Sequence, residues 1–443
     1  MGASPRRWEA GRFLRRASAS SFARHVAILT SGTAAGYALT ALAAPVLSRL
    51  FDPAQFGLLA LFTSIVSILA EGASARYGLT VVLPAEDDDA ANLLSLALLI
   101  GLGASVLALL AVAAGGRWMA EVLGNAQLAA YLWWVPAALL ASSAAESLSF
   151  WATRRKAFPT ISVSQVLRSA GAAAVQVAAG LLGAGAGGLV VGRVAGEASA
   201  AATLGWRCWR GEGDVLRRAA SWPRMRALAR AYADFPKFSL PQALVNAFSQ
   251  SVPVFLLAYF FDTAVVGLYA MGHRLLHLPA RFIGQSVRQV FMQRASEAHT
   301  HGLPLAPLAG RATLGLAAMA AIPAAIVVAA GPSLFGFVLG SEWIAAGEYA
   351  RWMVLWLFFA FVNPPASVLA QVLRRQRFLL VFDLAQLVAR VAAVVAGGLL
   401  HSPLTAVALF SVAGAAFNAY LVAAMLLYSR GHPAPPPDAA RTA

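Results

Sequence analysis

The 443-residue chain is 59% hydrophobic and only 12% charged, and its formal net charge is +15. Soluble globular proteins contain about 25% charged residues, so this composition excludes a soluble protein and predicts one that crosses a membrane several times. The single cysteine, Cys208, excludes an internal disulfide and a metal site built from several cysteines.

Apolar runs long enough to cross a bilayer recur along the whole chain, without the two-residue alternation of a membrane β-barrel. The expected spans are residues 25–47, 57–82, 90–114, 129–150, 160–183, 187–206, 238–260, 264–292, 310–330, 348–372, 378–400 and 404–428. We therefore predict an all-α polytopic membrane protein with twelve transmembrane helices. The length and the basic leader of the first run favour an uncleaved span over a signal peptide.

Basic residues mark one side of the membrane. They gather in the segments 1–24, 154–156, 207–237 and 374–377, all of which the twelve spans place on the same side. The opposite side has little beyond Arg49, Arg117 and Arg351. The positive-inside rule then predicts that both termini are cytoplasmic. The net charge thus indicates topology and attraction to lipid headgroups, and no nucleic-acid partner is expected.

The chain repeats itself after about 210 residues. FDPAQFGLLA at 51–60 aligns with FDTAVVGLYA at 261–270. Two shorter matches follow in the same order, Val122-Leu123-Gly124 with Val338-Leu339-Gly340, and Arg154-Arg155 plus Phe158 with Arg374-Arg375 plus Phe378. This order predicts a duplication that forms two pseudo-symmetric six-helix lobes, 25–206 and 238–428, around a central cavity.

Three segments flank or join the predicted lobes. Residues 1–24 form a basic cytoplasmic tail. Residues 207–237 interleave apolar side chains with arginines, which predicts a cytoplasmic amphipathic linker lying in the membrane interface. Residues 429–443 are rich in proline and alanine and are predicted to form a disordered cytoplasmic tail.

The eighth span, 264–292, has a stripe of polar and charged residues on one face. Its members follow at intervals of three, four, four and three: Arg274, His277, Arg281, Gln285 and Arg288. No acid lies in this span, and an arginine at the bilayer centre costs about 2.5–3.5 kcal/mol, so such residues normally face protein or a water-filled cavity. The stripe predicts a positively charged internal surface for an anionic ligand. The alternatives are ion pairs with other helices and, for Arg288, snorkelling to the interface.

Other charges within the spans have a structural interpretation. Glu197 follows Arg193 by four residues and Asp383 precedes Arg390 by seven, so each pair shares a helix face and is expected to neutralise itself. The acid run 86–89 is expected to be a solvated helix start, with a cation site as the alternative. No catalytic or metal-binding constellation is present, so we expect no enzyme activity and no cofactor.

Three stretches carry a family resemblance. They are GTAAGYALTALAAPVLSRLFDPAQFGLLALFTSIVSIL at 32–69, ARYGLTVVLPAEDDDAANLLSLAL at 75–98, and YADFPKFSLPQALVNAFSQSVPVFLLAYFFDTAVVGLYAMGHRLLHLPARFIGQSVRQVF at 232–291. The sequence resembles the oligosaccharide flippases, the polysaccharide-exporting branch of the multidrug/oligosaccharidyl-lipid/polysaccharide exporter superfamily. The resemblance is specific in these blocks and generic elsewhere.

The resemblance implies a flippase that moves undecaprenyl-diphosphate-linked oligosaccharides across the bacterial inner membrane by alternating access, for lipopolysaccharide, capsule or exopolysaccharide synthesis. Spans one, two, seven and eight would line the cavity. The diphosphate would be bound by Arg76, Arg274, His277, Arg281 and Arg288, because guanidinium forks match phosphate oxygens.

Further roles follow from the same resemblance. Glu71 would carry a coupling ion or pair with one of the arginines. Gln242, Asn246 and Gln250 would contact sugar hydroxyls or other helices. Membrane lipids, a glycan polymerase and a chain-length regulator are further candidate partners.

Other classes of protein remain as alternatives. A multidrug exporter of the same fold should have an acid-rich cavity, whereas this one is net basic. A major-facilitator transporter should have a glycine- and arginine-rich loop where this chain has PAEDDD. A glycan polymerase or ligase would need larger outside loops. A non-transporting component of the glycan assembly machinery is the remaining alternative.

Overall fold

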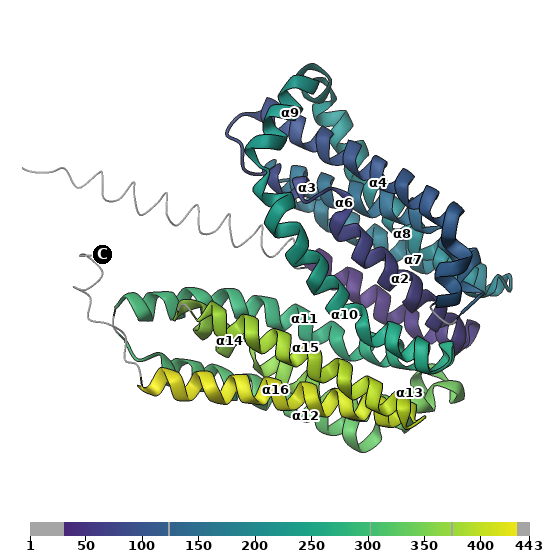
Figure 1. Ribbon diagram of the computed structural model, residues 1–443, viewed down its shortest axis with the longest axis vertical. Helices are drawn as coiled ribbons and strands as arrows, with labels where there is room; N and C mark the ends of the chain where they lie inside the picture. Colours follow the sequence, from purple (N-terminus) through teal and green to yellow (C-terminus); the bar gives the residue numbers. More distant parts are fainter. Residues whose placement is uncertain (1–30, 123–124, 302, 374, 432–443) are drawn as a thin grey trace, which may run out of the picture. The chain divides into compact units, whose positions relative to one another are not determined.

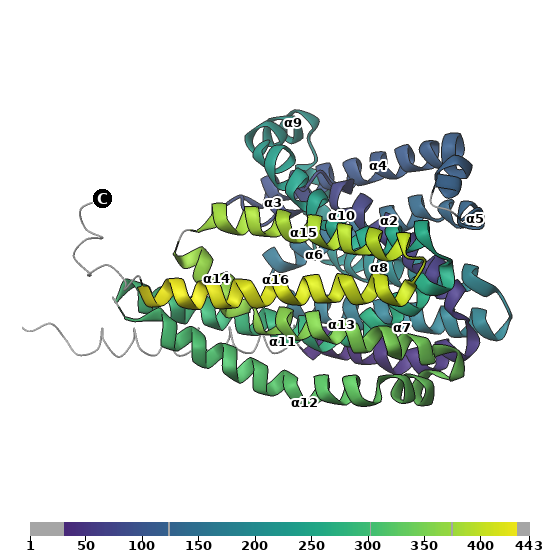
Figure 2. The same ribbon diagram turned by 60° about the horizontal axis from the view of Figure 1, so that its bottom comes forward.

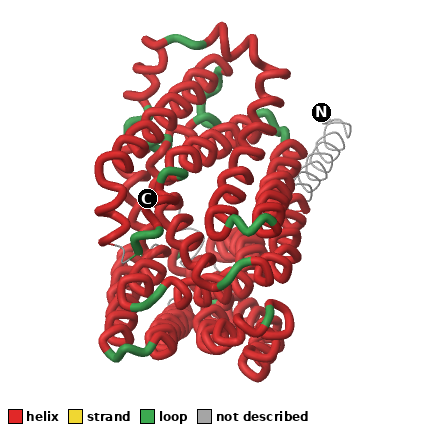
Figure 3. Tube along the Cα trace, turned by 90° about the vertical axis from the view of Figure 1, so that its right-hand side faces the viewer, coloured by secondary structure: helices red, strands yellow, loops and turns green. Residues whose placement is uncertain are grey.

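A computed structural model describes residues 31–122, 125–301, 303–373 and 375–431. For residues 278–283, 285, 286, 289, 300, 376 and 431 it describes the backbone but not the side chains. The described residues form helices joined by short loops and contain no strand (Figure 3). This agrees with the predicted all-α class.

The first part of the chain begins with a helix over residues 31–50. Its further helices are α2 (Pro53–Ala73), α3 (Tyr77–Thr80), α4 (Asp87–Val122), α5 (Leu128–Leu132), α6 (Val135–Arg154), α7 (Phe158–Leu181), α8 (Gly185–Ala219) and α9 (Trp222–Ala231) (Figure 1). A proline stands in the first turn of α2, α6, α7 and α9. Proline is favourable there because the first amides of a helix have no partner within the helix.

The second part begins with a short π-helix, η1 (Phe235–Ser239). It continues with α10 (Leu240–Phe260), α11 (Thr263–Thr300), α12 (Leu305–Leu339), the 3-10 helix η2 (Ser341–Trp343), α13 (Ile344–Val362), α14 (Pro364–Val372), α15 (Gln376–Leu399) and α16 (Pro403–Gly431). Gly340 ends α12 with a φ of 111°. Residues other than glycine rarely adopt this backbone conformation.

Eight stretches of helix are long and apolar enough to cross a membrane within the described part of the chain. They cover Pro53–Ala73, Asp87–Val122, Leu128–Arg154, Phe235–Phe260, Leu305–Leu339, Ser341–Val372, Arg377–Leu399 and Pro403–Arg430. The other expected spans fall on the helix over residues 31–50 and on α7, α8 and α11, three long helices outside that set. The protein is thus a multi-pass helical membrane protein, while the count of twelve stays a prediction.

Two of the expected spans are interrupted. The span 57–82 is divided because α2 ends at Ala73, and Ala75 and Arg76 then adopt left-handed φ values of 46° and 65° before α3 begins. The span 348–372 is divided at Asn363, where the pair Pro364-Pro365 starts α14. Asn363 itself keeps helical backbone angles, but Pro364 and Pro365 have no N–H group to donate to the preceding turn, so this division has a local cause.

The chain separates into two compact units. The first contains Met1–Ala44, Ile65–Met119 and Gln127–Phe248, and the second Pro45–Ser64, Ala120–Ala126 and Ser249–Ala443. In the first unit α8 packs along α7 and α6, and in the second α13 packs against α11, α12 and α16. Figures 1 and 2 both show α16 running beside α15 in the second unit.

The two copies of the longest sequence repeat have the same local structure. Asp52 accepts a hydrogen bond from the amide of Gln55 at the start of α2, and Asp262 accepts one from the amide of Val265 at the start of α11, both at 2.8 Å. These are N-caps, which occupy amides that the helix leaves unpaired. The duplicated sequence therefore begins two helices in the same way.

The same two helix starts touch through the equivalent glycines of the repeat. A Cβ atom at Gly57 would overlap the carbonyl oxygen of Thr263, and one at Gly267 would overlap the carbonyl oxygen of Pro53. Each glycine thus meets the carbonyl four residues before the other glycine. Only a residue without a side chain allows the two backbones to approach so closely.

Candidate functional site

The predicted cationic stripe lies on one uninterrupted helix. α11 runs from Thr263 to Thr300, so the intervals of three and four residues place the stripe positions on one helix face. Arg274 is half-buried and Arg288 is exposed. Arg281, and Gln285 beside it on the stripe, lie outside the residues whose side chains the structure describes.

His277 belongs to a stack of rings that was not predicted from the sequence. It stacks on His273 at 4.9 Å between ring centroids, and His273 stacks in turn on Tyr269 at 6.0 Å. Trp356 of α13 lies beside both imidazoles, at 5.9 Å from His273 and 6.5 Å from His277. The sequence does indicate that Tyr269, His273 and His277 share a helix face, because they follow at intervals of four along α11. Trp356 is 79 residues further along, beyond the reach of helical periodicity.

Arg76 is held by two acids of the first unit. Its guanidinium lies 2.6 Å from Glu71 and 3.9 Å from Glu146, and its side chain is 19% exposed. Of the two roles expected for Glu71, the structure shows the pairing with an arginine. The left-handed backbone at Arg76 turns the chain back at the end of α2 and lets the side chain meet Glu71 five residues earlier.

The buried Glu197 joins two half-buried arginines of the first unit. Its carboxylate lies 2.6 Å from Arg193 on α8 and 3.4 Å from Arg168 on α7, and only 4% of its side chain is exposed. The expected pairing with Arg193 is confirmed. Arg168 is an additional partner that helix spacing could not predict.

The expected pairing of Arg390 with Asp383 is wrong. No carboxylate lies within 4.0 Å of Arg390 among the described side chains, and Asp383 is exposed. The guanidinium lies instead over two aromatic rings, 4.9 Å from the centroid of Trp356 and 5.1 Å from that of Phe410. Asp383 lies seven residues, or nearly two helix turns, before Arg390 on α15. The rings of Trp356 on α13 and Phe410 on α16 lie closer to the guanidinium than this carboxylate does.

The candidate sugar contacts lie along one edge of α10. Gln242, Asn246 and Gln250 follow at intervals of four and are all exposed. Contact with sugar hydroxyls and contact with other helices both stay predictions.

The acid run at the start of α4 binds arginines. Asp87 accepts hydrogen bonds from Arg154 at 2.9 Å and from Arg155 at 2.7 Å, and Arg155 also lies 2.7 Å from Glu212 of α8. Within the described ranges no group of three histidines, cysteines or acids is placed to hold a metal ion. The run thus links helix ends and also lies in the first turn of α4, where the helix dipole favours negative charge.

The predicted amphipathic linker contains α9, which packs on the first unit. Met225 and Leu228 are buried in the same core as Tyr77, whose hydroxyl donates a hydrogen bond to the carbonyl of Ala229 at 2.9 Å. Arg224 on the exposed face of α9 forms a two-pronged pair with Asp89 at 2.6 and 2.7 Å. Helix α8 extends beyond residue 206, and a non-helical residue at Glu212 lies within this extension.

Burial of Cys208 yields a prediction about its reactivity. Desolvation raises the pKa of this thiol to about 11, with Glu212 adding to the rise and Arg155 opposing it. Because the thiolate is the reactive form, we expect maleimide labelling at neutral pH to be about a hundredfold slower than for an ordinary thiol. The rate should climb about tenfold per pH unit.

The matched control is Gly211→Cys in a Cys208→Ser background, which puts an exposed thiol on the same helix. Labelling would be followed by mass shift in detergent at several pH values. Equal rates for the two thiols at neutral pH would contradict the expected burial effect.

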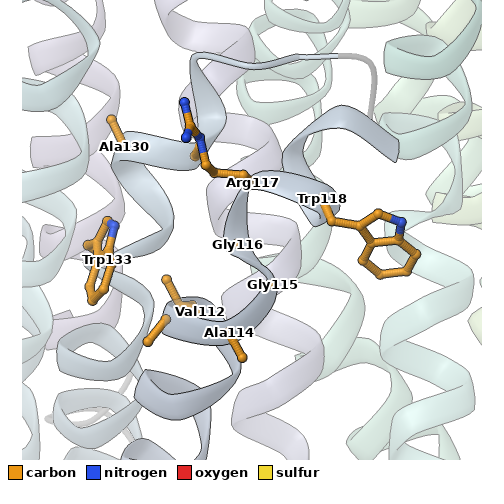
Figure 4. A pocket seen from close by; sticks show the side chains of 10 residues that line it. Val112, Ala114, Gly115, Gly116, Arg117, Trp118, Ala130 and Trp133 are labelled. Atoms are coloured by element: carbon orange, nitrogen blue, oxygen red, sulfur yellow. The ribbon is translucent and has the colours of Figure 1, made fainter.

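Several cavities lie between described residues. A polar one of about 410 Å³ lies between the start of α2 and η2, lined by Arg49, Asp52 and Glu342 among others. An apolar one of about 220 Å³ lies between α11, α12 and α13. Another, of about 570 Å³, lies between the end of α4 and α5. Figure 4 shows Arg117 and Trp133 at its sides and Trp118 directed away.

Several solved structures that resemble this chain are membrane transporters. The chain matches an inward-facing multidrug resistance MATE family transporter of the MOP superfamily with a TM-score of 0.64 and 13% identity, over 89% of this chain and 94% of that one. It matches the lipid II flippase MurJ in an inward closed conformation with a TM-score of 0.61 and 12% identity, over 91% and 87%. The protein is therefore a polytopic membrane protein with the fold of the MOP-superfamily transporters.

Another structure of this fold is a MOP superfamily transporter from Pyrococcus furiosus, described as having a binding pocket of reverse polarity. Its TM-score is 0.59 and its identity 14%, over 92% of this chain and 95% of that one. The model of the polysaccharide biosynthesis protein family matches residues 46–348, and the chain belongs to that family. A search of curated proteins finds no match.

Proposed function

We propose that the protein is a flippase for undecaprenyl-diphosphate-linked oligosaccharides. The observation that carries this proposal is the stripe on α11, which lies on a continuous helix of a chain that belongs to a polysaccharide biosynthesis family. α11 contains no acid between Asp262, which caps its start, and Glu297 in its last turn. A membrane-buried helix face with several basic groups and no acid favours an anionic ligand, and a diphosphate supplies two adjacent anionic groups.

The proposal assigns different tasks to the basic residues. Arg274, Arg281 and Arg288 would bind phosphate oxygens along α11, with His277 at the edge of the same face. Arg76 would join them by exchanging its bonds with Glu71 and Glu146 for bonds to the diphosphate. Gln242, Asn246 and Gln250 would present amide groups to the sugars. No bond in the substrate is made or broken, so the task is binding and passage.

Topology follows from the proposal. Both termini would be cytoplasmic in the inner membrane, and two six-helix lobes, 25–206 and 238–428, would open alternately to the two sides. The basic segments 1–24 and 207–237 and the tail 429–443 would then face the cytoplasm. A polymerase that extends the glycan on the outer side would receive the product. The basic segments support this orientation.

The decisive experiment changes the charge at Arg281 in a strain whose surface glycan depends on this protein. Arg281→Ala should reduce surface glycan about tenfold or more while membrane abundance stays near normal, because hydrogen bonds to charged groups contribute about 1.5–3 kcal/mol. Arg281→Glu should be worse because it repels the diphosphate. Arg281→Lys should keep part of the activity, since a point charge attracts phosphate without a planar fork.

Arg294→Ala is the matched control. Arg294 is on the same helix, is exposed, and lies away from the stripe. Surface glycan would be measured by labelling and abundance by immunoblot. Normal glycan with well-expressed Arg281→Glu would refute diphosphate binding by Arg281. Efflux of a lipophilic cation that survives in Arg281→Glu and fails in the deletion strain would favour a multidrug exporter of the same fold.

A further inference from the structure

The cavity between the end of α4 and α5 is lined by residues of the first unit alone. Its volume of about 570 Å³ lies within the range of about 300–1,000 Å³ that is typical of small-molecule sites. A Cβ atom built at Gly115 meets nothing within 4 Å, so the hollow is open beside the backbone of α4 at this position. The floor on this side consists of small residues, Ala113, Ala114, Gly115 and Gly116.

One cation and one aromatic ring stand at the sides of this floor. They are Arg117 of α4 and Trp133, which directly follows α5 (Figure 4). Among the described residues no carboxylate lies within 4.0 Å of the Arg117 guanidinium, although Glu121 follows one turn later on α4. Residues 125–134 after the turn contain no charged side chain. The cavity therefore combines an apolar floor with a positively charged rim.

The length of α4 places this cavity at the level of the lipid headgroups. Asp87 and Asp89 in its first turn pair with arginines, and ionised carboxylates are costly in hydrocarbon, so the apolar core begins after Asp89. A helix rises about 1.5 Å per residue, so about 20 residues cross a hydrocarbon core of about 30 Å. Residues 112–118 lie beyond that length. Exposed tryptophans, which are typical of the membrane–water interface, gather at the same level: Trp118, Trp133 and Trp134.

We propose that this cavity binds the headgroup of an anionic phospholipid. The guanidinium of Arg117 would donate hydrogen bonds to the phosphate, and charge-assisted bonds of this kind are stronger than those between neutral groups. The floor of α4 and the ring of Trp133 would cover the glycerol and the first methylene groups of the chains. A zwitterionic lipid is a poorer ligand, because its ammonium group is repelled by Arg117.

This binding does not depend on the proposed function. The cavity is at the end of α4 remote from the basic segments, so the proposed topology assigns the lipid to the outer leaflet of the inner membrane. The cationic stripe of α11 belongs to the second unit and contributes nothing to the lining. A variant that loses the lipid therefore says nothing about the diphosphate site, and the two proposals stand or fall separately.

The test uses the purified full-length protein in phosphatidylcholine nanodiscs that contain a small fraction of a photoactivatable phosphatidylglycerol. Cross-links are mapped by proteolysis and mass spectrometry. We expect the phosphatidylglycerol probe to label residues 112–133 about fivefold more than a photoactivatable phosphatidylcholine at the same fraction, the factor typical of one basic residue near an anionic lipid. Arg117→Gln, at an exposed position, should remove this preference, and Arg117→Lys should keep most of it.

The hollow itself is tested by filling it. Gly115→Leu adds a side chain where open space is present and should reduce labelling of residues 112–133 by both probes. Gly103→Leu is the matched control, because a Cβ there also meets nothing within 4 Å and the residue is on α4 outside the cavity. Melting temperatures in the same nanodiscs would show that both variants are folded. Equal loss of labelling in the two variants would contradict a site at the cavity.

Other occupants give different results. Equal labelling by the two probes in the wild-type protein, or a preference that persists in Arg117→Gln, would overturn the proposal. Inorganic phosphate that competes as well as unlabelled phosphatidylglycerol would identify a site for free anions and would also overturn it. Labelling that is lost on addition of a lipid-linked oligosaccharide, but not of unlabelled phosphatidylglycerol, would instead assign the cavity to a glycan.

Discussion

Gly57→Ala is expected to destabilise the protein, although the same change inside most helices does the reverse. Alanine normally stabilises a helix interior by about 0.5–1 kcal/mol relative to glycine. At Gly57 the added methyl group would overlap the carbonyl oxygen of Thr263, so the starts of α2 and α11 would have to separate. Overpacking of this kind costs typically about 1–3 kcal/mol and occasionally more. Gly267→Ala should have the same effect through Pro53.

The two glycines should also be coupled. Once the first methyl group has separated the backbones, the second meets less resistance, so the double variant should lose less stability than the sum of the single variants. Thermal unfolding in one detergent would give the ranking. Gly103→Ala is the matched control, because nothing lies within 4 Å of a Cβ built at that position in α4. Equal melting temperatures for Gly57→Ala and Gly103→Ala would contradict the close approach.

Loss of the Glu197 carboxylate is expected to cause the largest loss of stability among the ion pairs. Glu197→Ala removes the shared partner of Arg193 and Arg168, whose side chains are 36% and 31% exposed. Breaking a fully buried pair from one side costs about 3–5 kcal/mol, and the partial exposure of the arginines lowers the cost below that range. We expect low membrane abundance and an early-melting, heterogeneous protein in size-exclusion chromatography. Glu197→Gln should be intermediate, since its amide oxygen still accepts hydrogen bonds.

Glu348→Ala provides the comparison. Glu348 pairs with Arg351 three residues later, but its side chain is 42% exposed. Exposed pairs contribute about 0–1 kcal/mol, so this variant should behave almost like the wild type. Equal abundance and stability of Glu197→Ala and Glu348→Ala would contradict the expectation that the buried carboxylate contributes more to stability than the exposed one.

Local patterns predicted the features that depend on one helix. The spacing along α11 anticipated a shared face, and the interval of four anticipated the contact of Arg193 with Glu197. The repeated Phe-Asp and Gly-Leu of the two copies anticipated two helix starts of the same design. In each case the partners are within one turn or two of each other, where backbone geometry alone determines which side chains are neighbours.

Features that depend on several helices were missed. Trp356 and Phe410 reach Arg390 from different helices, and their partnership displaced the expected pairing with Asp383. Arg168 joins Glu197 across the packing of α7 on α8. The break at Arg76 was hidden because its two left-handed residues are not glycines. Such positions depend on tertiary packing, which no periodicity along the chain encodes.

The glycine contact also bears on how this chain arose. Each copy of the repeat offers the other the same two groups, a glycine and the carbonyl oxygen four residues before it. A surface that binds its own copy in this reciprocal manner is the geometry of a two-fold symmetric dimer interface. A chain with a single copy would present that surface to a second chain. If the predicted duplication produced this chain, one polypeptide now makes a contact of the kind that two identical chains make in a homodimer.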